Sequence, residues 1–112
     1  ISSPPTAILI SSIISAIGAR RAISEAGLRM GRDVSVVIYD DDLSYFRNGG
    51  DEPIFTAVRS SVRMAGRRLA ALLLDSIANP GQAPRNELLE AELMVGLSTG
   101  PAPALRRVLE QG

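Results

Sequence analysis

The first forty residues alternate between continuous apolar runs and a helical pattern of apolar positions. Thr6–Ser11 is a short aliphatic run after two prolines, which predicts a strand buried on both faces. Ser12 stands at the N-cap of a predicted helix, and Gly27 stands just beyond its end. Val34–Tyr39 is a second continuous apolar run. Strand, helix and strand within about 35 residues predict a βαβ unit with parallel strands.

The second half of the chain predicts a polar loop, a short extended segment, a long helix, a second extended segment and a short terminal helix: Asp40–Gly50, Pro53–Val58, Ser60–Ala78, Glu87–Leu97 and Ala104–Glu110. The long helix carries an apolar stripe that includes Val62, Leu69 and Leu73. Asn79-Pro80-Gly81 ends this helix.

Composition excludes several classes of function. The 112 residues suffice for one domain, and twelve basic residues balance twelve acidic ones, so no nucleic-acid-binding surface is predicted. The chain has no Cys and no His, which removes the thiol nucleophile, the imidazole base and the usual zinc ligands. No apolar run reaches the ~18 residues of a membrane span. We expect a protein that is not an enzyme and binds no metal, and a chain whose true N-terminus is missing.

Parallel sheets bind ligands beyond the carboxyl ends of their strands. This rule selects Ser11 and Ser12 after the first predicted strand and Asp40 after the second. A carboxylate at a strand end can accept hydrogen bonds from two vicinal hydroxyls, although Asp40 could instead cap its loop. Ser12 could serve as helix cap, as ligand contact, or as both. Asp41 and Asp42 extend an acidic run, but no metal-ligand spacing accompanies it, so we interpret them as loop acids or caps.

Four stretches of the chain have the order and spacing of a known sequence pattern. They are Pro5–Ala7 with Ala16 to Gly27, Asp33–Val37 with Asp40-Asp41, Thr56–Arg59 with Gly66, and Glu92-Leu93 before Ser98-Thr99. In these stretches the chain resembles the LacI-type (lactose-repressor) family of transcriptional regulators. The resemblance implies an α/β fold: a parallel-sheet βαβ lobe of a two-lobe, periplasmic-binding-protein-like (type I) effector domain, of which this chain is the C-terminal portion.

The same resemblance implies a division of the chain between two lobes. Residues 1–57 would form the C-terminal lobe, residues 58–86 the crossover and a helix of the other lobe, and residues 87–112 the return strand and tail. The Ser60–Ala78 helix should then not pack on the Ile13–Ala26 helix. Ser60 would lie at the crossover, where it could contact ligand or serve as a helix N-cap.

The resemblance further implies a cytoplasmic sensor of a small-molecule effector, a sugar or glycoside, with no cofactor. Operator DNA would be bound through a helix-turn-helix absent from this chain. The family usually has Asn-Asp where this chain has Ser12-Ile13, which leaves room for an apolar patch, a larger glycoside or another ligand class. A homodimer would form through the first helix and the loop after Asp40, with Ile14, Ile17, Tyr45 and Phe46 as interface residues.

Two alternatives share parts of this pattern. A periplasmic sugar-binding protein of an ABC transporter has the same fold, but the Asp33–Val37 stretch and the spacing from Thr56–Arg59 to Gly66 favour the regulator. A receiver domain of a two-component system needs a lysine near its phosphoacceptor, and this chain has none. We therefore reject the receiver domain.

Overall fold

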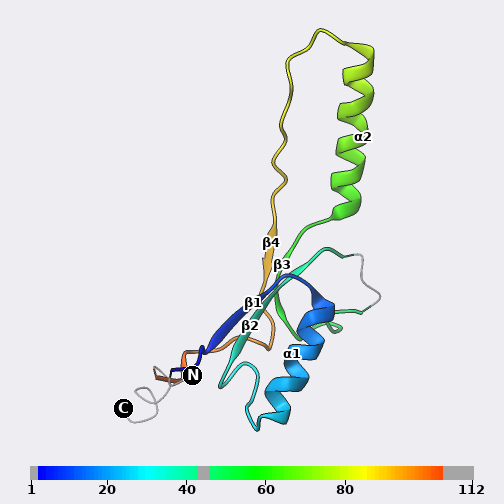
Figure 1. Cartoon of the computed structure of the whole chain (residues 1–112). Helices are drawn as coiled ribbons and strands as arrows, with labels where there is room; N and C mark the ends of the chain where they lie inside the picture. The colour runs from blue at the N-terminus through cyan, green and yellow to red at the C-terminus, as the bar shows by residue number, and fades with distance from the viewer. Residues whose placement is uncertain (1–2, 43–45, 105–112) are drawn as a thin grey trace.

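A four-stranded sheet with one helix on its face forms the body of the protein. The computed structural model describes residues 3–42 and 46–104. The elements are β1 (Ala7–Ile10), α1 (Ile13–Glu25), β2 (Ser35–Asp40), β3 (Thr56–Arg59), α2 (Val62–Ala78) and β4 (Glu92–Met94). The strand order is β1-β2-β3-β4, with β1, β2 and β3 parallel and β4 antiparallel to β3. The predicted α/β class and the parallel βαβ unit are confirmed (Figure 1).

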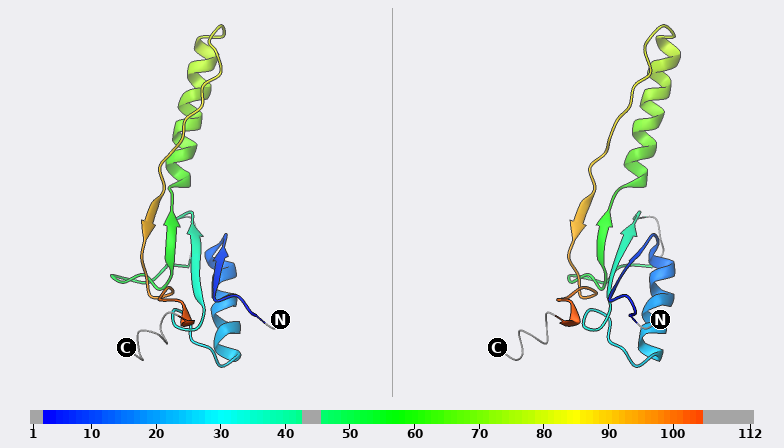
Figure 2. Two further views of the ribbon diagram at one scale, coloured as in Figure 1. Left: turned by 90° about the vertical axis from the view of Figure 1, so that its left-hand side faces the viewer. Right: turned by 60° about the vertical axis from the view of Figure 1, so that its left-hand side comes forward.

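The first helix begins and ends where the sequence predicts. The Ser12 side chain accepts hydrogen bonds from the backbone N–H groups of Ile14 and Ser15, at 3.1 and 3.3 Å. Gly27 follows the helix with a φ of 76°, a left-handed conformation that glycine adopts without steric cost. α1 lies against one face of the sheet (Figure 2).

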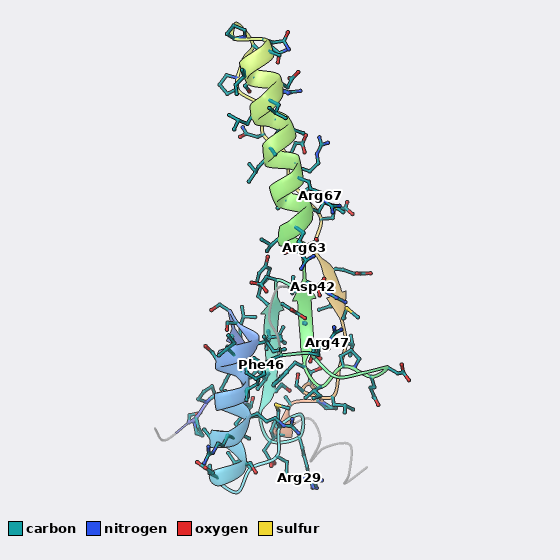
Figure 3. All side chains as sticks on the ribbon, turned by 90° about the vertical axis from the view of Figure 1, so that its right-hand side faces the viewer. Arg29, Asp42, Phe46, Arg47, Arg63 and Arg67 are labelled. Atoms are coloured by element: carbon teal, nitrogen blue, oxygen red, sulfur yellow. The ribbon has the colours of Figure 1, made fainter. Side chains whose placement is uncertain are left out.

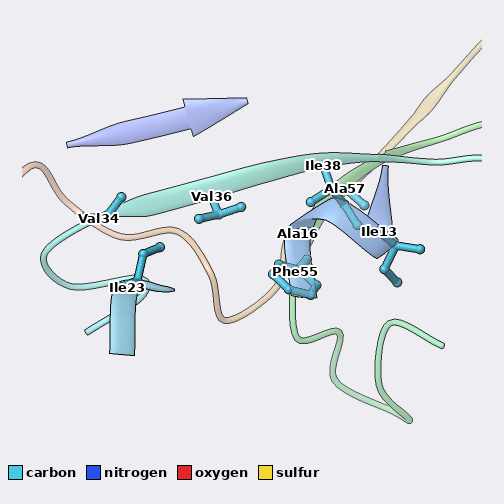
Figure 4. Close-up of a cluster of buried hydrophobic side chains, with 8 residues drawn as sticks. All are labelled: Ile13, Ala16, Ile23, Val34, Val36, Ile38, Phe55 and Ala57. Atoms are coloured by element: carbon cyan, nitrogen blue, oxygen red, sulfur yellow. The ribbon is translucent and has the colours of Figure 1, made fainter. Parts of the chain in front are cut away.

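The core lies between α1 and the sheet (Figure 4). In β2 every second residue, Val36 and Ile38, is fully buried, as alternation along a strand requires. The buried hydrophobic residues are Ile13, Ala16, Ile23, Val34, Val36, Ile38, Phe55 and Ala57. They come from α1, β2, the loop before β2, and β3 with the residue before it, so the βαβ unit and β3 share one core.

The prediction that β1 is buried on both faces was wrong. Leu9 is 76 % exposed, and only Ile10 of this strand packs against the core. β1 is an edge strand, and among the described elements no helix packs on the face of the sheet opposite α1. A continuous apolar run is typical of a strand buried on both faces, but the described elements cover this sheet on one face only.

Residues 96–100 pass the amino-terminal ends of β2 and β3 and bond to them. Ser98 is fully buried; its hydroxyl accepts from Thr56 N at 2.8 Å and donates to Val36 O, and its carbonyl accepts from Val36 N at 2.9 Å. The Thr56 hydroxyl in turn bonds to the Thr99 hydroxyl at 2.7 Å and accepts from Gly96 N at 2.9 Å. The last part of the described chain is therefore fixed to β2 and β3 by hydrogen bonds.

The second helix stands away from this body (Figures 1 and 2). α2 contacts neither α1 nor any strand of the described chain, and none of its residues is buried. The expectation that it does not pack on α1 is confirmed. Two ion pairs, Arg68 with Glu87 and Arg85 with Asp75, hold the return segment against the helix. The molecule is accordingly elongated, at 65 × 31 × 29 Å.

Several predicted boundaries change. α2 begins at Val62, and its N-cap is Ser61, whose side chain accepts from Met64 N at 3.1 Å. The N-cap role predicted for Ser60 is therefore wrong. The extended segment predicted for Glu87–Leu97 forms a ladder only at Glu92–Met94. Most of the predicted terminal helix, from residue 105 onward, lies outside the described residues.

Candidate ligand-binding site

The carboxyl ends of the parallel strands form one edge of the sheet. Ile10 pairs with Ile38, and Asp40 pairs with Arg59, so Ser12, just after β1, and Asp40, the last residue of β2, lie at the same edge. A pocket of about 290 Å³ opens there. Its lining residues are Asp40, Asp42, Phe46, Arg47, Asn48, Gly49, Gly50, Pro53, Arg59 and Met94. The predicted site residue Asp40 therefore lies in a real concavity.

Asp40, Asp42 and Arg59 form a hydrogen-bonded network in this pocket. Asp42 has a φ of 62°, which Asp tolerates better than most residues, and its backbone N–H donates to Asp40 Oδ1 at 3.0 Å. Arg59 Nη2 donates to Asp42 Oδ1 at 2.7 Å. The hydrogen bond from Arg59 to Asp42, and the charge of Asp42, raise the pKa of Arg59 above its ordinary value. The guanidinium is thus a fixed cation at every accessible pH.

Asn48 anchors the loop that forms the pocket wall. Its side-chain nitrogen donates to Phe55 O at 2.7 Å, its side-chain oxygen accepts from Phe55 N at 2.6 Å, and its backbone oxygen accepts from Ile54 N at 3.0 Å. These bonds tie the loop to the chain just before β3. The neighbouring Arg47 lines the pocket and has no hydrogen-bond or ion-pair partner among the described residues (Figure 3).

The other predicted ligand residues lie outside this pocket. Ser12 caps α1, and Ser11 is exposed beside it. The Ser60 hydroxyl bonds to the Tyr39 hydroxyl, and strand alternation places both on the face of the sheet opposite Asp40 and Arg59. Only the Ser60 backbone N–H reaches Asp40, at its carbonyl, at 3.3 Å. Ligand contact by Ser11, Ser12 and Ser60 stays a prediction.

Arg59 is the pocket residue that sequence reasoning missed most clearly. It ends β3 as Asp40 ends β2, so the rule that selected Asp40 also applies to it. The predicted extended segment, Pro53–Val58, ended one residue before Arg59, the last residue of β3. Asn48 and Met94 carried no comparable signal, because the loop fold and the β3–β4 pairing bring them to the pocket.

The predicted dimer residues that the structure describes are exposed. Ile14 is 62 %, Ile17 41 % and Phe46 53 % exposed, while Tyr45 lies outside the described residues. Their role at an interface stays a prediction. Among residues 3–42 and 46–104, no acidic cluster has the arrangement of a metal site, and no helix there is long and apolar enough to cross a membrane.

A parallel sheet with a polar pocket at its carboxyl edge defines an α/β ligand-binding domain. Residues 1–99 match the family described as periplasmic binding protein-like domain. The chain is 48 % identical over 101 residues to the HTH-type transcriptional regulator AglR of Rhizobium meliloti (strain 1021), covering 90 % of this chain and 28 % of the relative. It is 40 % identical over 93 residues to the lactose operon repressor of Escherichia coli (strain K12), covering 80 % and 24 %. The HTH-type transcriptional repressor CytR of the same strain is 31 % identical over 101 residues, covering 89 % and 28 %.

These similarities settle the family. The chain belongs to the LacI-type family of transcriptional regulators and lies within their periplasmic-binding-protein-like domain. It spans about a quarter of the length of these relatives. The predicted family and fold class are confirmed.

Proposed function

We propose that this chain is the effector-sensing part of a LacI-type transcriptional regulator, in which a sugar or glycoside binds at the Asp40 pocket and alters the affinity for operator DNA. The observation that carries the proposal is the pocket itself, a polar concavity at the carboxyl edge of a parallel sheet. The relatives named above are regulators, and one is a repressor of an operon named for a sugar. A DNA-binding regulator of this kind would act in the cytoplasm.

The proposed architecture has two lobes. Residues 1–57 form the C-terminal lobe, residues 58–86 the crossover and a helix of the other lobe, and residues 87–112 the return strand and tail. The unburied apolar stripe of α2 supports this division, because such a stripe needs a partner outside the βαβ unit. Exposed Ile14, Ile17 and Phe46 on the first lobe support a homodimer.

The proposed mechanism is a shift between two closures of the lobes. An effector can act only through different affinities for the DNA-competent and incompetent states, and such couplings are typically about 1–3 kcal/mol. The chain leaves β3 for α2 directly after Arg59, so the pocket lies at the start of the crossover. Ligand that touches both lobes there would favour one closure over the other.

Substitution of Asp40 tests this proposal. Asp40→Asn keeps the shape of the side chain and removes its charge, so we expect effector binding to weaken by about 1.5–3 kcal/mol, the worth of a charged hydrogen bond. Operator binding without effector should hardly change. Isothermal titration calorimetry of the full-length regulator with a panel of mono- and disaccharides measures the first effect, and fluorescence anisotropy with operator DNA measures the second.

Asp51→Asn is the matched control, because Asp51 is an exposed loop acid that does not line the pocket. It should bind effector like the wild type. Equal affinities for wild type and Asp40→Asn would remove Asp40 from the site. Binding of a nucleobase or amino acid in place of every sugar would contradict the ligand class.

A further inference from the structure

A donor and an acceptor stand side by side at the last rung of the sheet. Asp40 and Arg59 are paired across β2 and β3, and each lies two residues beyond a core residue, Ile38 and Ala57. Strand alternation therefore places both side chains on the α1 face, and both line the pocket. A carboxylate only accepts hydrogen bonds and a guanidinium only donates them. The pair thus offers complementary partners to one ligand.

Asp42 orients both groups. Its backbone N–H occupies Asp40 Oδ1 and its carboxylate holds Arg59 Nη2, as described above. No described residue donates to Asp40 Oδ2, and Arg59 Nη1 reaches only the sulfur of Met94, at 3.7 Å, a weak acceptor. Each group is therefore held by a hydrogen bond to Asp42 and keeps hydrogen-bonding capacity for a ligand.

The charge around this pair favours a neutral ligand. Asp42 already balances Arg59, and Asp40 and Glu92 add further negative charge that acts on the same guanidinium. Arg47 also lines the pocket, so its charged lining residues are two acids and two arginines, Asp40, Asp42, Arg47 and Arg59. An anionic group that approached Arg59 would have to compete with Asp42 and would meet the Asp40 carboxylate beside it. A hydroxyl, which both donates and accepts, meets no such repulsion.

We propose that Asp40, Asp42 and Arg59 together determine the specificity of the effector site: one hydroxyl of a neutral polyol donates to Asp40, a neighbouring oxygen accepts from Arg59, and the uronic acid counterpart is disfavoured. The inference rests on the proposed function, since it assigns a ligand class to the same pocket. Asp42 is a positioning residue, and Arg59 supplies the hydrogen-bond donor.

Calorimetry of the full-length regulator tests the pair. The probes are maltose, lactose, cellobiose, glucose and galactose, with glucuronate and galacturonate as anionic counterparts. The wild type should bind a neutral sugar at least about tenfold more tightly than its uronate. Arg59→Met should weaken neutral binding by about tenfold or more, the equivalent of one charge-assisted hydrogen bond. Arg67→Met is the control, because Arg67 is exposed on α2 and does not line the pocket (Figure 3).

Asp42→Gly separates orientation from folding. Glycine adopts the left-handed backbone of residue 42 without cost, so the variant loses the carboxylate and can keep the bond to Asp40. It should weaken neutral binding and also narrow the ratio of neutral to uronate affinity, since one negative charge is gone. Asp42→Asn, which retains the side-chain shape, should narrow the ratio in the same direction, and thermal unfolding checks that both variants fold.

Four results would overturn the inference. Equal neutral-sugar affinity for wild type and Arg59→Met would remove Arg59 from recognition while leaving the proposed function intact. If the wild type bound a uronate as tightly as the neutral sugar, the proposed selection against anionic ligands would be contradicted. An unchanged ratio in Asp42→Gly would give Asp42 a purely structural role. Absence of binding to every sugar by the wild type would instead contradict the proposed function, and the inference with it.

Discussion

Gly96 lies where the segment after β4 passes the chain just before β3. A Cβ atom at this position would stand 2.6 Å from Pro53 O and 2.7 Å from Phe55 O, both backbone atoms that cannot turn aside. Gly96 N also donates to the buried Thr56 hydroxyl, so the backbone cannot move away without loss of that bond. The absence of a side chain at residue 96 is therefore a condition for closing the sheet.

We expect Gly96→Ala to lower the free energy of unfolding by about 1–3 kcal/mol, the usual cost of overpacking. Gly81→Ala is the matched control, because nothing lies within 4 Å of its added Cβ and its φ is not positive. That variant should stay within about 0.5 kcal/mol of the wild type. Urea unfolding of the full-length protein measures both, and equal stabilities would show that the 96–100 segment can shift freely.

At single positions the sequence is informative where the cause is local. Ser12 and Gly27 were predicted correctly because capping depends on a few neighbouring residues. Ser60 and Ser61 are adjacent hydroxyls with equal capping chemistry, and tertiary contact decides between them: the Ser60 side chain bonds to Tyr39, which leaves Ser61 to cap α2. Asp40 followed from strand direction alone, and the same rule applies to Arg59 at the end of β3, whereas the place of Asp42 depends on the loop conformation.

At the scale of elements, the pattern of apolar residues predicted strands and helices but not their cover. β1 and β2 have similar apolar runs, yet alternate residues of β2 are buried and β1 is mostly exposed, because β1 lies at the edge and no described element covers one face of the sheet. The course of residues 79–91 along α2 was not predictable either, because ion pairs between distant residues hold it there.

One of these pairs gives a pH-dependent prediction. The hydrogen bond and the charge of Arg68 lower the pKa of Glu87 below its ordinary value, with a smaller contribution from Arg85. A lowered carboxyl pKa adds stability that is complete above the unfolded-state pKa and is lost as the pH falls through the folded-state pKa. The attachment of the return segment to α2 should therefore weaken on acidification below the ordinary range of glutamate, and less sharply at high salt.

Titration of the Glu87 carboxyl by carbon-13 NMR measures this effect. Arg68→Met removes the main cause, so the pKa of Glu87 should rise back toward its ordinary value. Arg67→Met is the control: Arg67 lies next to Arg68 but makes no ion pair with Glu87, so its loss should leave the titration unchanged. An identical Glu87 titration in wild type and Arg68→Met would show that the ion pair does not form in solution.

At the scale of the whole molecule, the chain exposes far more surface than a compact protein of its mass. Its accessible surface is 8627 Å², whereas a compact monomer of this mass exposes about 6,000 Å². Its radius of gyration is 19.4 Å, against about 13 Å for a compact domain of this length. Much of the excess lies on α2 and the return segment, where no described element covers the apolar side chains. This is the shape expected of a piece that completes its core with chain outside it.

Truncation of an apolar residue of α2 should therefore affect stability differently in the full-length protein and in the 112-residue chain. Leu69 is 67 % exposed here and belongs to the apolar stripe of α2. In the full-length protein the other lobe should cover it, so Leu69→Ala should lower the free energy of unfolding by about 2–5 kcal/mol, the cost of truncating a buried leucine. In the 112-residue chain the side chain is already in water, and the change should stay within about 0.5 kcal/mol.

Ile38→Ala, in the core of the βαβ unit, is the control and should lower the free energy of unfolding strongly in both chains. Urea unfolding of the four variants and their parents measures these differences, and a small effect of Leu69→Ala in the full-length protein would contradict the assignment of α2 to a second lobe.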